Sequence, residues 1–167
     1  PHDCAFGFRP GKNIRENAAE HAGHKNLLCM DIRDFFETIE REWVEALFVS
    51  VGLKADVAEL LARFVTIDGR LPLGLATSPV ISNAIAYPVD IALKVLSDKV
   101  GAVYTRYADD LSFSGNESLP DVEDVRQILR DHGFALADEK TRRSKIGQAH
   151  FVTGLSVSDS KQPHVPR

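Results

Sequence analysis

The sequence is poor in cysteine, with only Cys4 and Cys29 among 167 residues. The two thiols form no C-x-x-C pair and show no metal-ligand spacing, which argues against both a disulfide scaffold and a cysteine-based metal site. A chain with so few thiols is typical of a reducing compartment. We therefore predict a cytoplasmic protein.

Long hydrophobic runs are also missing. No window approaches the roughly 18 consecutive apolar residues of a membrane span, so we expect no association with a membrane. The first residues, Pro1-His2-Asp3, resemble neither a signal peptide nor a natural start, and we expect an excised piece of a longer protein. The hydrophobic content of 44% predicts one compact domain with a core.

The overall charge does not indicate a nucleic-acid-binding protein, because the net charge is -4 and the pI is about 5.9. Its distribution is uneven. Residues 140–167 carry six Lys and Arg side chains against one Asp, a net charge of +5. Much of the negative charge lies in residues 31–68 and 121–139, where carboxylates that could bind metal are mixed with ordinary solvated helix faces.

Hydrophobic periodicity and turn residues predict an alternating order of strands and helices. A polar helical segment extends through His21, and Ser78-Pro79 is a strong helix start with Ser78 as N-cap. Asp68-Gly69 is typical of a tight hairpin turn, and Gly133 of the position after a helix end. The predicted strands are 27–32, 103–107, 111–114, 134–137 and 150–157, and the predicted helices are 41–51, 55–64, 78–99 (bent near Pro88) and 121–132. This order predicts an α+β, ferredoxin-like fold with helices on one face of an antiparallel sheet.

Three carboxylates are predicted to meet at one end of this sheet. Asp31 ends a strand, and Asp109 and Asp110 lie at the tip of the 103–114 hairpin. Each Asp alone is more simply explained as a turn residue or a helix cap. Together they would repel one another unless cations lie between them, and oxygen ligands favour Mg²⁺, which Mn²⁺ can replace. Two ions about 3.5–4 Å apart support phosphoryl displacement, which predicts nucleotidyl transfer.

The surrounding residues resemble a known family. Asp31-Ile32-Arg33-Asp34-Phe35-Phe36, Gly74-x-x-x-Ser78-Pro79-x-x-Ser82-Asn83 and Tyr107-Ala108-Asp109-Asp110 resemble motifs A, B and C of reverse transcriptases, in the correct order. Gly7-Phe8-x-x-Gly11 resembles a fingers motif, and Gly133-Phe134 with Lys140-Thr141 resembles motif D. The chain is thus similar to a reverse transcriptase over nearly its whole length.

Two weaker motifs narrow the resemblance. Asn17-Ala18-Ala19-Glu20-His21 and Val152-Thr153-Gly154 resemble signatures of retron reverse transcriptases. They favour a retron enzyme over a group II intron or CRISPR-associated relative. Ser78-Pro79 also argues against diversity-generating retroelements, in which Ser-Gln is found at this point.

The resemblance implies roles for individual residues. Asp31 and Asp109 should bind both metal ions, Asp110 should support the site, and the backbone carbonyl of Ile32 should be a further metal ligand. Phe36 should be the steric gate that excludes a ribose 2′-hydroxyl, whereas Phe35 better fits a core aromatic. Lys140 should help neutralise or protonate departing pyrophosphate.

For four other residues, two interpretations stay open. Arg9 and Lys12 either clamp the nucleotide triphosphate or are plain surface charges. Asn17 and His21, four residues apart on one helix face, act either in RNA recognition or as a structural hydrogen-bonded pair.

The nucleotide-binding motif around Gly74 departs from the family, because Leu73 stands where Gln is usual. Leucine makes no side-chain hydrogen bond, so nucleotide positioning differs, activity is reduced, or a neighbour takes over.

The resemblance implies partial fingers in residues 1–26, a palm in 27–158 and a basic tail in 159–167 that leads toward an absent thumb. The implied function is an RNA-directed DNA polymerase that uses dNTPs, an RNA template and primer, and two Mg²⁺ ions to copy the cognate non-coding RNA of a bacterial retron into DNA. Retrons serve in antiphage defence, usually with an effector protein. We expect the fragment alone to bind metal weakly and polymerise poorly.

Two alternatives stay open. One is another reverse transcriptase, either defence-associated or similar to group II intron enzymes. The other is a degenerate palm that binds RNA or a protein without catalysis.

Overall fold

A computed structural model describes residues 1–145, 147–158 and 162–165. Asp159, Lys161 and Arg167 of the predicted basic tail lie outside this described part. The helices are α1 (Ile14–Ala19), α2 (Phe35–Thr38), α3 (Arg41–Ser50), α4 (Ala55–Val65), α5 (Ser78–Ile85), α6 (Tyr87–Lys99), α7 (Val122–Asp131) and the 3-10 helix η1 (Asp138–Lys140). The strands are β1 (Asn26–Asp31), β2 (Val103–Tyr107), β3 (Asp110–Gly115), β4 (Arg142–Lys145), β5 (Phe151–Val152) and β6 (Leu155–Ser156).

A four-stranded antiparallel sheet organises the chain, with the strand order β2-β3-β1-β4. The central strand β1 is buried on both faces: Leu28 and Met30 belong to the main core, whereas Leu27 belongs to a second, smaller cluster. This explains why its sequence is a nearly continuous apolar run rather than an alternating one.

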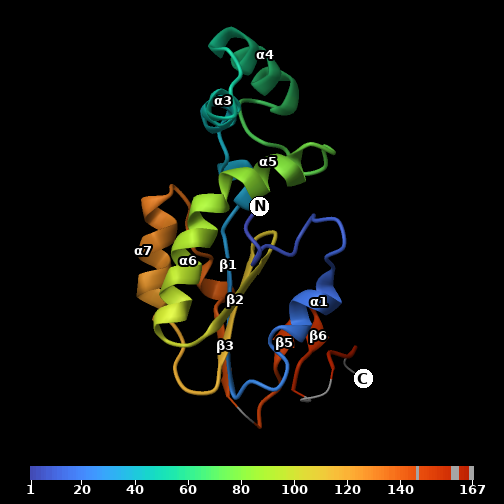
Figure 1. Cartoon of the computed structure of the whole chain (residues 1–167), viewed down its shortest axis with the longest axis vertical. Helices are drawn as coiled ribbons and strands as arrows, with labels where there is room; N and C mark the ends of the chain where they lie inside the picture. Colours follow the sequence, from blue (N-terminus) through green and yellow to red (C-terminus); the bar gives the residue numbers. More distant parts are fainter. Residues whose placement is uncertain (146, 159–161, 166–167) are drawn as a thin grey trace.

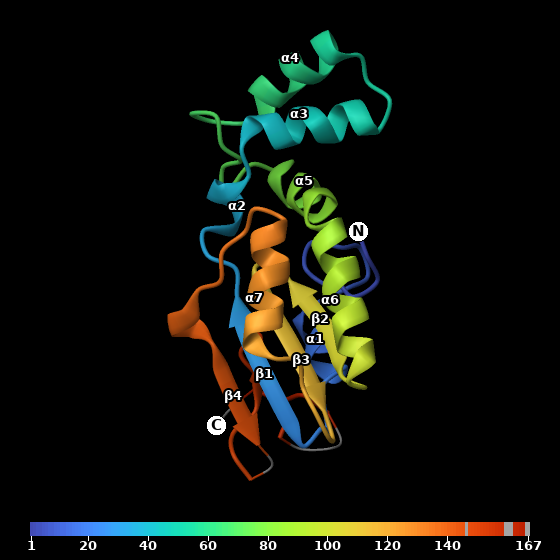
Figure 2. The same ribbon diagram turned by 90° about the vertical axis from the view of Figure 1, so that its left-hand side faces the viewer.

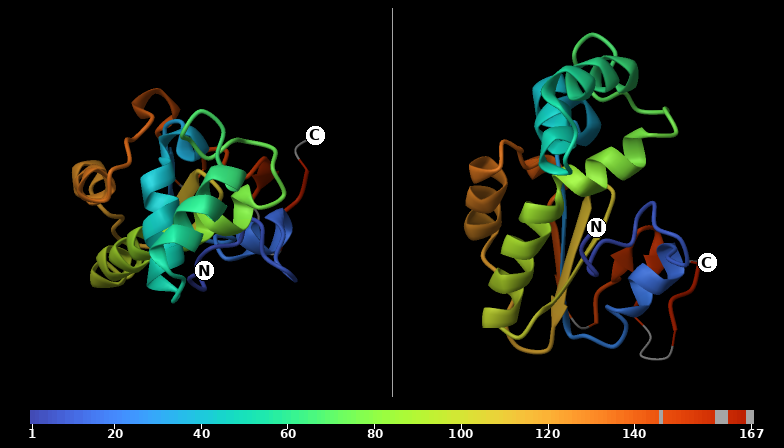
Figure 3. Two further views of the ribbon diagram at one scale, coloured as in Figure 1. Left: turned by 90° about the horizontal axis from the view of Figure 1, so that it is seen from above. Right: turned by 45° about the horizontal axis from the view of Figure 1, so that its top comes forward.

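Helices α6 and α7 cover one face of the sheet (Figures 1 and 2). Their inward side chains, Leu93 from α6 and Val125 and Leu129 from α7, join the main core. Helix α1 and the β5–β6 hairpin lie on the opposite face (Figure 3), where Ala18 packs with Val152. The prediction of helices on one face therefore describes α6 and α7 but not α1.

The α3–α4 pair stands beyond the end of the sheet and connects β1 to α5 (Figure 2). The turn that follows α4 confirms the predicted hairpin, since Asp68 and Gly69 both have positive φ angles (50° and 76°) and Ile67 pairs with Arg70. Gly133 likewise has a φ of 80° directly after the end of α7, as predicted.

The predicted helix 78–99 is two helices, α5 and α6, separated at Ala86 and bent by 50°, close to the predicted bend at Pro88. The prediction of Ser78 as N-cap is wrong. Thr77 holds that position, and the Ser78 hydroxyl instead donates a hydrogen bond to the carbonyl of Pro72 (2.6 Å). No single helix in the described residues is long and apolar enough to cross a membrane; α5 and α6 pass that test only together, across their bend.

Three other predicted elements differ. Residues 134–137 form only an isolated bridge, Ile32 with Leu136, because the chain then turns into η1. Residues 150–157 form a hairpin rather than one strand, since Thr153 and Gly154 adopt left-handed conformations (φ 46° and 80°). Helix α1 is capped by Asn13, begins at Ile14 and ends at Ala19, before His21.

Candidate active site

Asp31, Asp109 and Asp110 lie at one end of the sheet. Asp31 is the last residue of β1, and in the antiparallel register its partner is Asp110, the first residue of β3. Asp109 lies in the turn between β2 and β3, and its carbonyl accepts a hydrogen bond from the backbone N–H of Ile32 (3.0 Å). Neighbouring strand ends therefore place three carboxyl groups beside one another.

The pKa values of Asp109 and Asp110 are raised in this setting. Burial, followed by the charges of Asp109 and Asp31, raises the pKa of Asp110 to about 6. Burial and the charge of Asp31 also raise the pKa of Asp109. Burial is thus the larger cause for both groups, and the negative charge of the neighbouring carboxylates adds to it.

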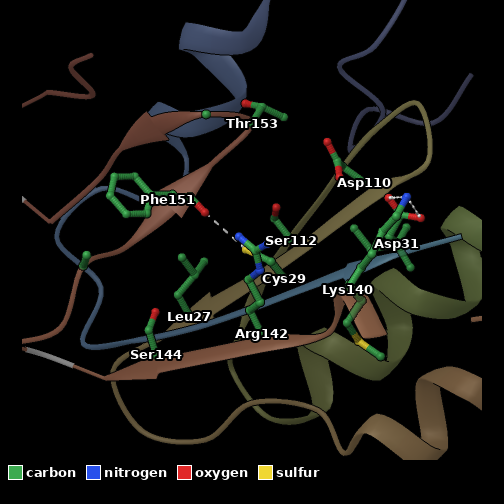
Figure 4. A pocket seen from close by; sticks show the side chains of 14 residues that line it. Leu27, Cys29, Asp31, Asp110, Ser112, Lys140, Arg142, Ser144, Phe151 and Thr153 are labelled. Carbon is green, nitrogen blue, oxygen red and sulfur yellow. Dashed lines mark hydrogen bonds and ion pairs between the residues drawn. The ribbon is translucent and has the colours of Figure 1, made fainter. Parts of the chain in front are cut away.

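Lys140 supplies part of the compensation. Its Nζ lies 2.9 and 3.0 Å from the two carboxylate oxygens of Asp31 (Figure 4). The hydrogen bond to Asp31 and the charge of that residue raise the pKa of Lys140. Helix η1, whose last residue is Lys140, makes this contact possible because it turns the chain back toward the end of β1.

The donor set suits a hard cation such as Mg²⁺. It offers carboxylate oxygens, and burial together with neighbouring negative charge raises the pKa values of Asp109 and Asp110. Among the described residues, however, no three His, Cys, Asp or Glu side chains are already arranged around a metal position. Asp31 would have to exchange Lys140 for a cation, since the ammonium group contacts both of its carboxylate oxygens. The carbonyl of Ile32, directly after Asp31, stays a predicted ligand.

A cavity of about 520 Å³ runs from Asp31 and Asp110 along the face of the sheet opposite α6 and α7 to the β5–β6 hairpin (Figure 4). Asp31 and Asp110 lie at one end, and Lys140 and Arg142 add positive charge along it. Phe151, Thr153 and Gly154 line the hairpin side, and Ser112 and Cys29 are among the residues of the sheet that line the cavity. The cavity therefore has carboxylates at one end, where Lys140 pairs with Asp31, and Arg142 of β4 as a further cation.

Cys29 ties this hairpin to the sheet, because its thiol donates a hydrogen bond to the carbonyl of Phe151 (3.4 Å). Burial raises the pKa of Cys29 to about 11, so the thiol stays protonated at neutral pH.

Phe36 and Phe35 are both buried in α2, directly after Asp34 in a left-handed conformation (φ 45°). They differ in their neighbours. Phe36 lies edge to face against Phe8 of the N-terminal segment (ring centroids 6.1 Å apart), whereas Phe35 packs on Phe134 (5.6 Å). Of these two rings, that of Phe36 is the one that packs against the predicted fingers segment.

Arg9 and Lys12 are engaged within the N-terminal segment. The guanidinium of Arg9 donates to the carbonyls of His2 (2.8 Å) and Ala5 (3.2 Å). The Lys12 ammonium lies 4.3 Å from the centre of the Phe6 ring and lines a separate cavity. The described contacts do not bring either cation to the carboxyl groups.

Leu73 and Gly74 lie in an exposed loop before α5, with 72% of Leu73 accessible. Gly74 has a φ of 110°, and a Cβ atom added to it would meet no atom within 4 Å. The loop therefore requires glycine for its backbone conformation rather than for a close contact.

Asn17 and His21 are both 1% exposed. The two ring nitrogens of His21 lie 2.7 Å from the hydroxyls of Ser114 and Thr105 on the sheet. His21 lies beyond the end of α1, so the two residues do not share one helix face as predicted. Their burial supports the structural interpretation over RNA recognition, although the partner of His21 is the sheet rather than Asn17.

Sequence patterns did not single out Asp90 and Arg106, which form a fully buried ion pair beside the turn that carries Asp109. A signal was present. Each is a charged residue inside an otherwise apolar segment, and buried charges are normally paired.

Known proteins resemble this chain at the sequence level. The family model described as "Reverse transcriptase (RNA-dependent DNA polymerase)" matches residues 2–160. Retron Mx65 reverse transcriptase of Myxococcus xanthus is 35% identical over 92% of this chain and 41% of its own length. Two proteins from Escherichia coli are also similar. Retron Ec73 reverse transcriptase is 36% identical over 93% of this chain and 56% of its own length. Retron Ec86 reverse transcriptase is 30% identical over 94% of this chain and 50% of its own length.

The chain thus spans about half the length of the curated relatives it matches. These relatives confirm the resemblance to retron reverse transcriptases that the motifs predicted. Because the family model covers nearly every residue, this chain belongs to the reverse transcriptase (RNA-dependent DNA polymerase) family.

Proposed function

We propose that the whole protein is an RNA-directed DNA polymerase and that this chain supplies its catalytic palm. The observation that carries the proposal is the pairing of Asp31 with Asp110 across β1 and β3, with Asp109 in the adjoining turn. When bound there, two divalent ions would activate the attacking hydroxyl and stabilise the leaving pyrophosphate.

The residues of the chain would act around that chemistry. Asp31 and Asp109 would hold the cations, and Asp110 would add negative charge beside them. Lys140 now neutralises Asp31; on release it would lie next to the departing pyrophosphate and could donate a proton to it. The ring of Phe36 would exclude a ribose 2′-hydroxyl, and Gly74 and Leu73 would lie near the incoming nucleotide. Contacts of Arg9 and Lys12 with the triphosphate would require both side chains to leave their present partners.

The cavity along the sheet suits a nucleic-acid strand that ends at the carboxyl groups. Arg142 provides a cation for a phosphate backbone, and the carboxylates lie at the end where the reacting hydroxyl would be. The partners are then an RNA template and primer, the DNA product and dNTPs.

The fold supports assignment of residues 27–158 to the palm. The elements of the main sheet follow the order β-α-β-β-α-β, and the strand order β2-β3-β1-β4 is the one expected of a ferredoxin-like sheet. We assign residues 1–26 to part of the fingers.

The retron subtype is supported by the names of the relatives and by the Asn17–His21 and Val152–Gly154 motifs. We propose that the whole protein copies a cognate non-coding RNA of a bacterial retron into DNA, priming from a 2′-hydroxyl of an internal guanosine. An effector protein would be its partner in defence.

Primer extension by the whole protein tests the polymerase. Asp31→Asn and Asp109→Asn should each lower kcat by about three orders of magnitude or more, because each removes several kcal/mol of metal-centred stabilisation. Asp124→Asn, on the exposed first turn of α7, is the matched control and should extend primers normally. Unchanged extension by both active-site variants would rule out this site.

Two measurements separate the alternatives. A degenerate palm that only binds RNA or protein should keep its divalent-metal and partner binding in both Asp→Asn variants. A retron enzyme should produce template-complementary cDNA covalently branched from RNA, whereas another reverse transcriptase should not.

A further inference from the structure

Asp90 on α6 and Arg106 on β2 form an ion pair in which both side chains are fully buried. Two guanidinium nitrogens of Arg106, Nε and Nη2, each lie 2.7 Å from a different carboxylate oxygen of Asp90. The hydroxyl of Tyr104 donates a further hydrogen bond to the same carboxylate (3.0 Å). The bidentate geometry fixes the guanidinium plane.

The remaining guanidinium nitrogen of Arg106, Nη1, points at the turn between β2 and β3. It donates a hydrogen bond to the carbonyl of Ala108 (3.0 Å). That carbonyl and the N–H of Asp109 belong to one peptide group, which is planar, so holding the carbonyl also orients the backbone at Asp109. Ala108 itself has a φ of 56°, a conformation that non-glycine residues adopt only where the surroundings enforce it.

The backbone of Arg106 is held as firmly as its side chain. Its N–H donates to the carbonyl of Cys4 (2.8 Å), and its carbonyl accepts from the N–H of Phe6 (2.7 Å). The backbone of Arg106 is therefore fixed, and its guanidinium group lies between α6 and the turn that carries Asp109.

Stability alone does not explain such a pair. Burying two charges costs so much solvation that an apolar pair of similar size is often at least as stable. What an apolar pair lacks is a donor for the Ala108 carbonyl.

We propose that Asp90 and Arg106 are positioning residues for Asp109: Asp90 orients the guanidinium, which holds the peptide that carries Asp109 into the site. This inference rests on the proposed function, because it treats Asp109 as a metal ligand. None of the three carboxylates of the site belongs to α6. The inference nevertheless assigns to α6, through Asp90, a role in setting the geometry of Asp109.

The test replaces the pair without opening the core. In the whole protein, Tyr104→Phe is the background, since it removes only the hydroxyl that would lose its partner. Asp90→Leu and Arg106→Met are then added together, which keeps the volume apolar while removing the donor to Ala108. Both proteins are compared by thermal unfolding, steady-state primer extension as a function of Mg²⁺, and hydrogen exchange of the backbone at residues 107–110.

We expect similar unfolding temperatures, a kcat about 100-fold lower without the pair, a higher Mg²⁺ concentration for half-maximal activity, and faster exchange at the turn. The KM for dNTP should change little. Arg106→Lys keeps the charge but not the planar guanidinium group, so its kcat should lie between those of the two proteins. Unchanged kcat, Mg²⁺ requirement and exchange in a folded protein without the pair would overturn the inference.

A failure of the proposed function can be distinguished from a failure of the positioning inference. If the unmodified whole protein shows no polymerase activity at all, the proposed function is rejected, and the exchange measurement still decides whether the pair holds the turn. If the background is active and only the pair is dispensable, the positioning inference alone is rejected.

Discussion

A Cβ atom added to Gly7 would lie 2.6 Å from the backbone nitrogen of Ala108, closer than carbon and nitrogen approach without bonding. Gly7 is buried, and its carbonyl accepts a hydrogen bond from the side chain of Asn83 on α5 (2.9 Å). The N-terminal segment therefore touches the turn that carries Asp109 at a point where only glycine fits.

Gly7→Ala should accordingly damage activity more than stability. The methyl group must push the turn away by several tenths of an ångström, and displacements approaching 1 Å cost up to about 100-fold in rate. We expect kcat in primer extension to fall by about 10- to 100-fold.

Gly11→Ala is the control for this change. Gly11 lies in the same segment, and a Cβ atom there would meet no atom within 4 Å, although its φ of 73° adds strain of about 1–2 kcal/mol. This variant should lose stability but keep its kcat. Equal losses of kcat in both variants would contradict the role of the Gly7 contact.

Phe36→Val should weaken the discrimination between dNTPs and NTPs. If the ring excludes the 2′-hydroxyl, its truncation should lower the ratio of the two kcat/KM values by about 10- to 200-fold, the range for small steric differences in a pocket. Competitive incorporation of dNTPs and NTPs measures this ratio.

Phe35→Val is the control that distinguishes a steric-gate role from a role in core packing. Phe35 is equally buried but packs on Phe134 rather than on the N-terminal segment, so its truncation should cost stability, at most about 3–5 kcal/mol, without changing the ratio. The steric-gate assignment would be wrong if Phe35→Val altered discrimination as much as Phe36→Val does.

Leu73→Gln should improve nucleotide use at little cost in stability, because the side chain is exposed. One new hydrogen bond is worth about 0.5–1.5 kcal/mol, so the KM for dNTP should fall by about 2- to 12-fold. Leu75→Gln, an exposed leucine in the same loop, is the matched control and should leave KM unchanged. A rise in KM for Leu73→Gln would show that leucine itself contributes to nucleotide binding.

Local patterns were enough to predict the end of the sheet where the carboxyl groups lie. An apolar run ending at Asp31 and a hairpin with Asp109 and Asp110 at its tip are both read from neighbouring residues, and the register of β1 and β3 then brings them together. Similarly, Asp68-Gly69 and Gly133 determine turns through their own φ angles.

The rest depends on partners far away in the sequence. Residues 142–145, Arg-Arg-Ser-Lys, have no hydrophobic alternation, yet they form β4 because the edge of β1 offers them backbone hydrogen bonds. Residues 134–137 are apolar enough for a strand, but they pair only at Leu136. The buried charge of Arg106 in β2 is explained only by its partner Asp90, which lies sixteen residues away in the sequence.

The buried imidazole of His21 should make the stability of the protein depend on pH. Burial, followed by the charge of His24, lowers the pKa of His21 to about 3, and the hydroxyls of Ser114 and Thr105 satisfy the neutral ring. In the unfolded chain the same group binds a proton below about pH 6.5. Between these values only the unfolded state is protonated, so stability rises with pH from about 3 to 6.5 and is lost as the pH falls through this window.

Lowering the pH from about 6.5 to 5 should therefore cost about 2 kcal/mol from this residue alone, measured by urea unfolding at each pH. In His21→Gln the protein should be less stable at pH 7 but lose about 2 kcal/mol less over the same interval. His132→Gln removes an imidazole that bonds only to the carbonyl of Ile128 in the described part of the chain, and it serves as the control. The same pH slope in His21→Gln as in the unmodified protein would show that acid sensitivity arises elsewhere.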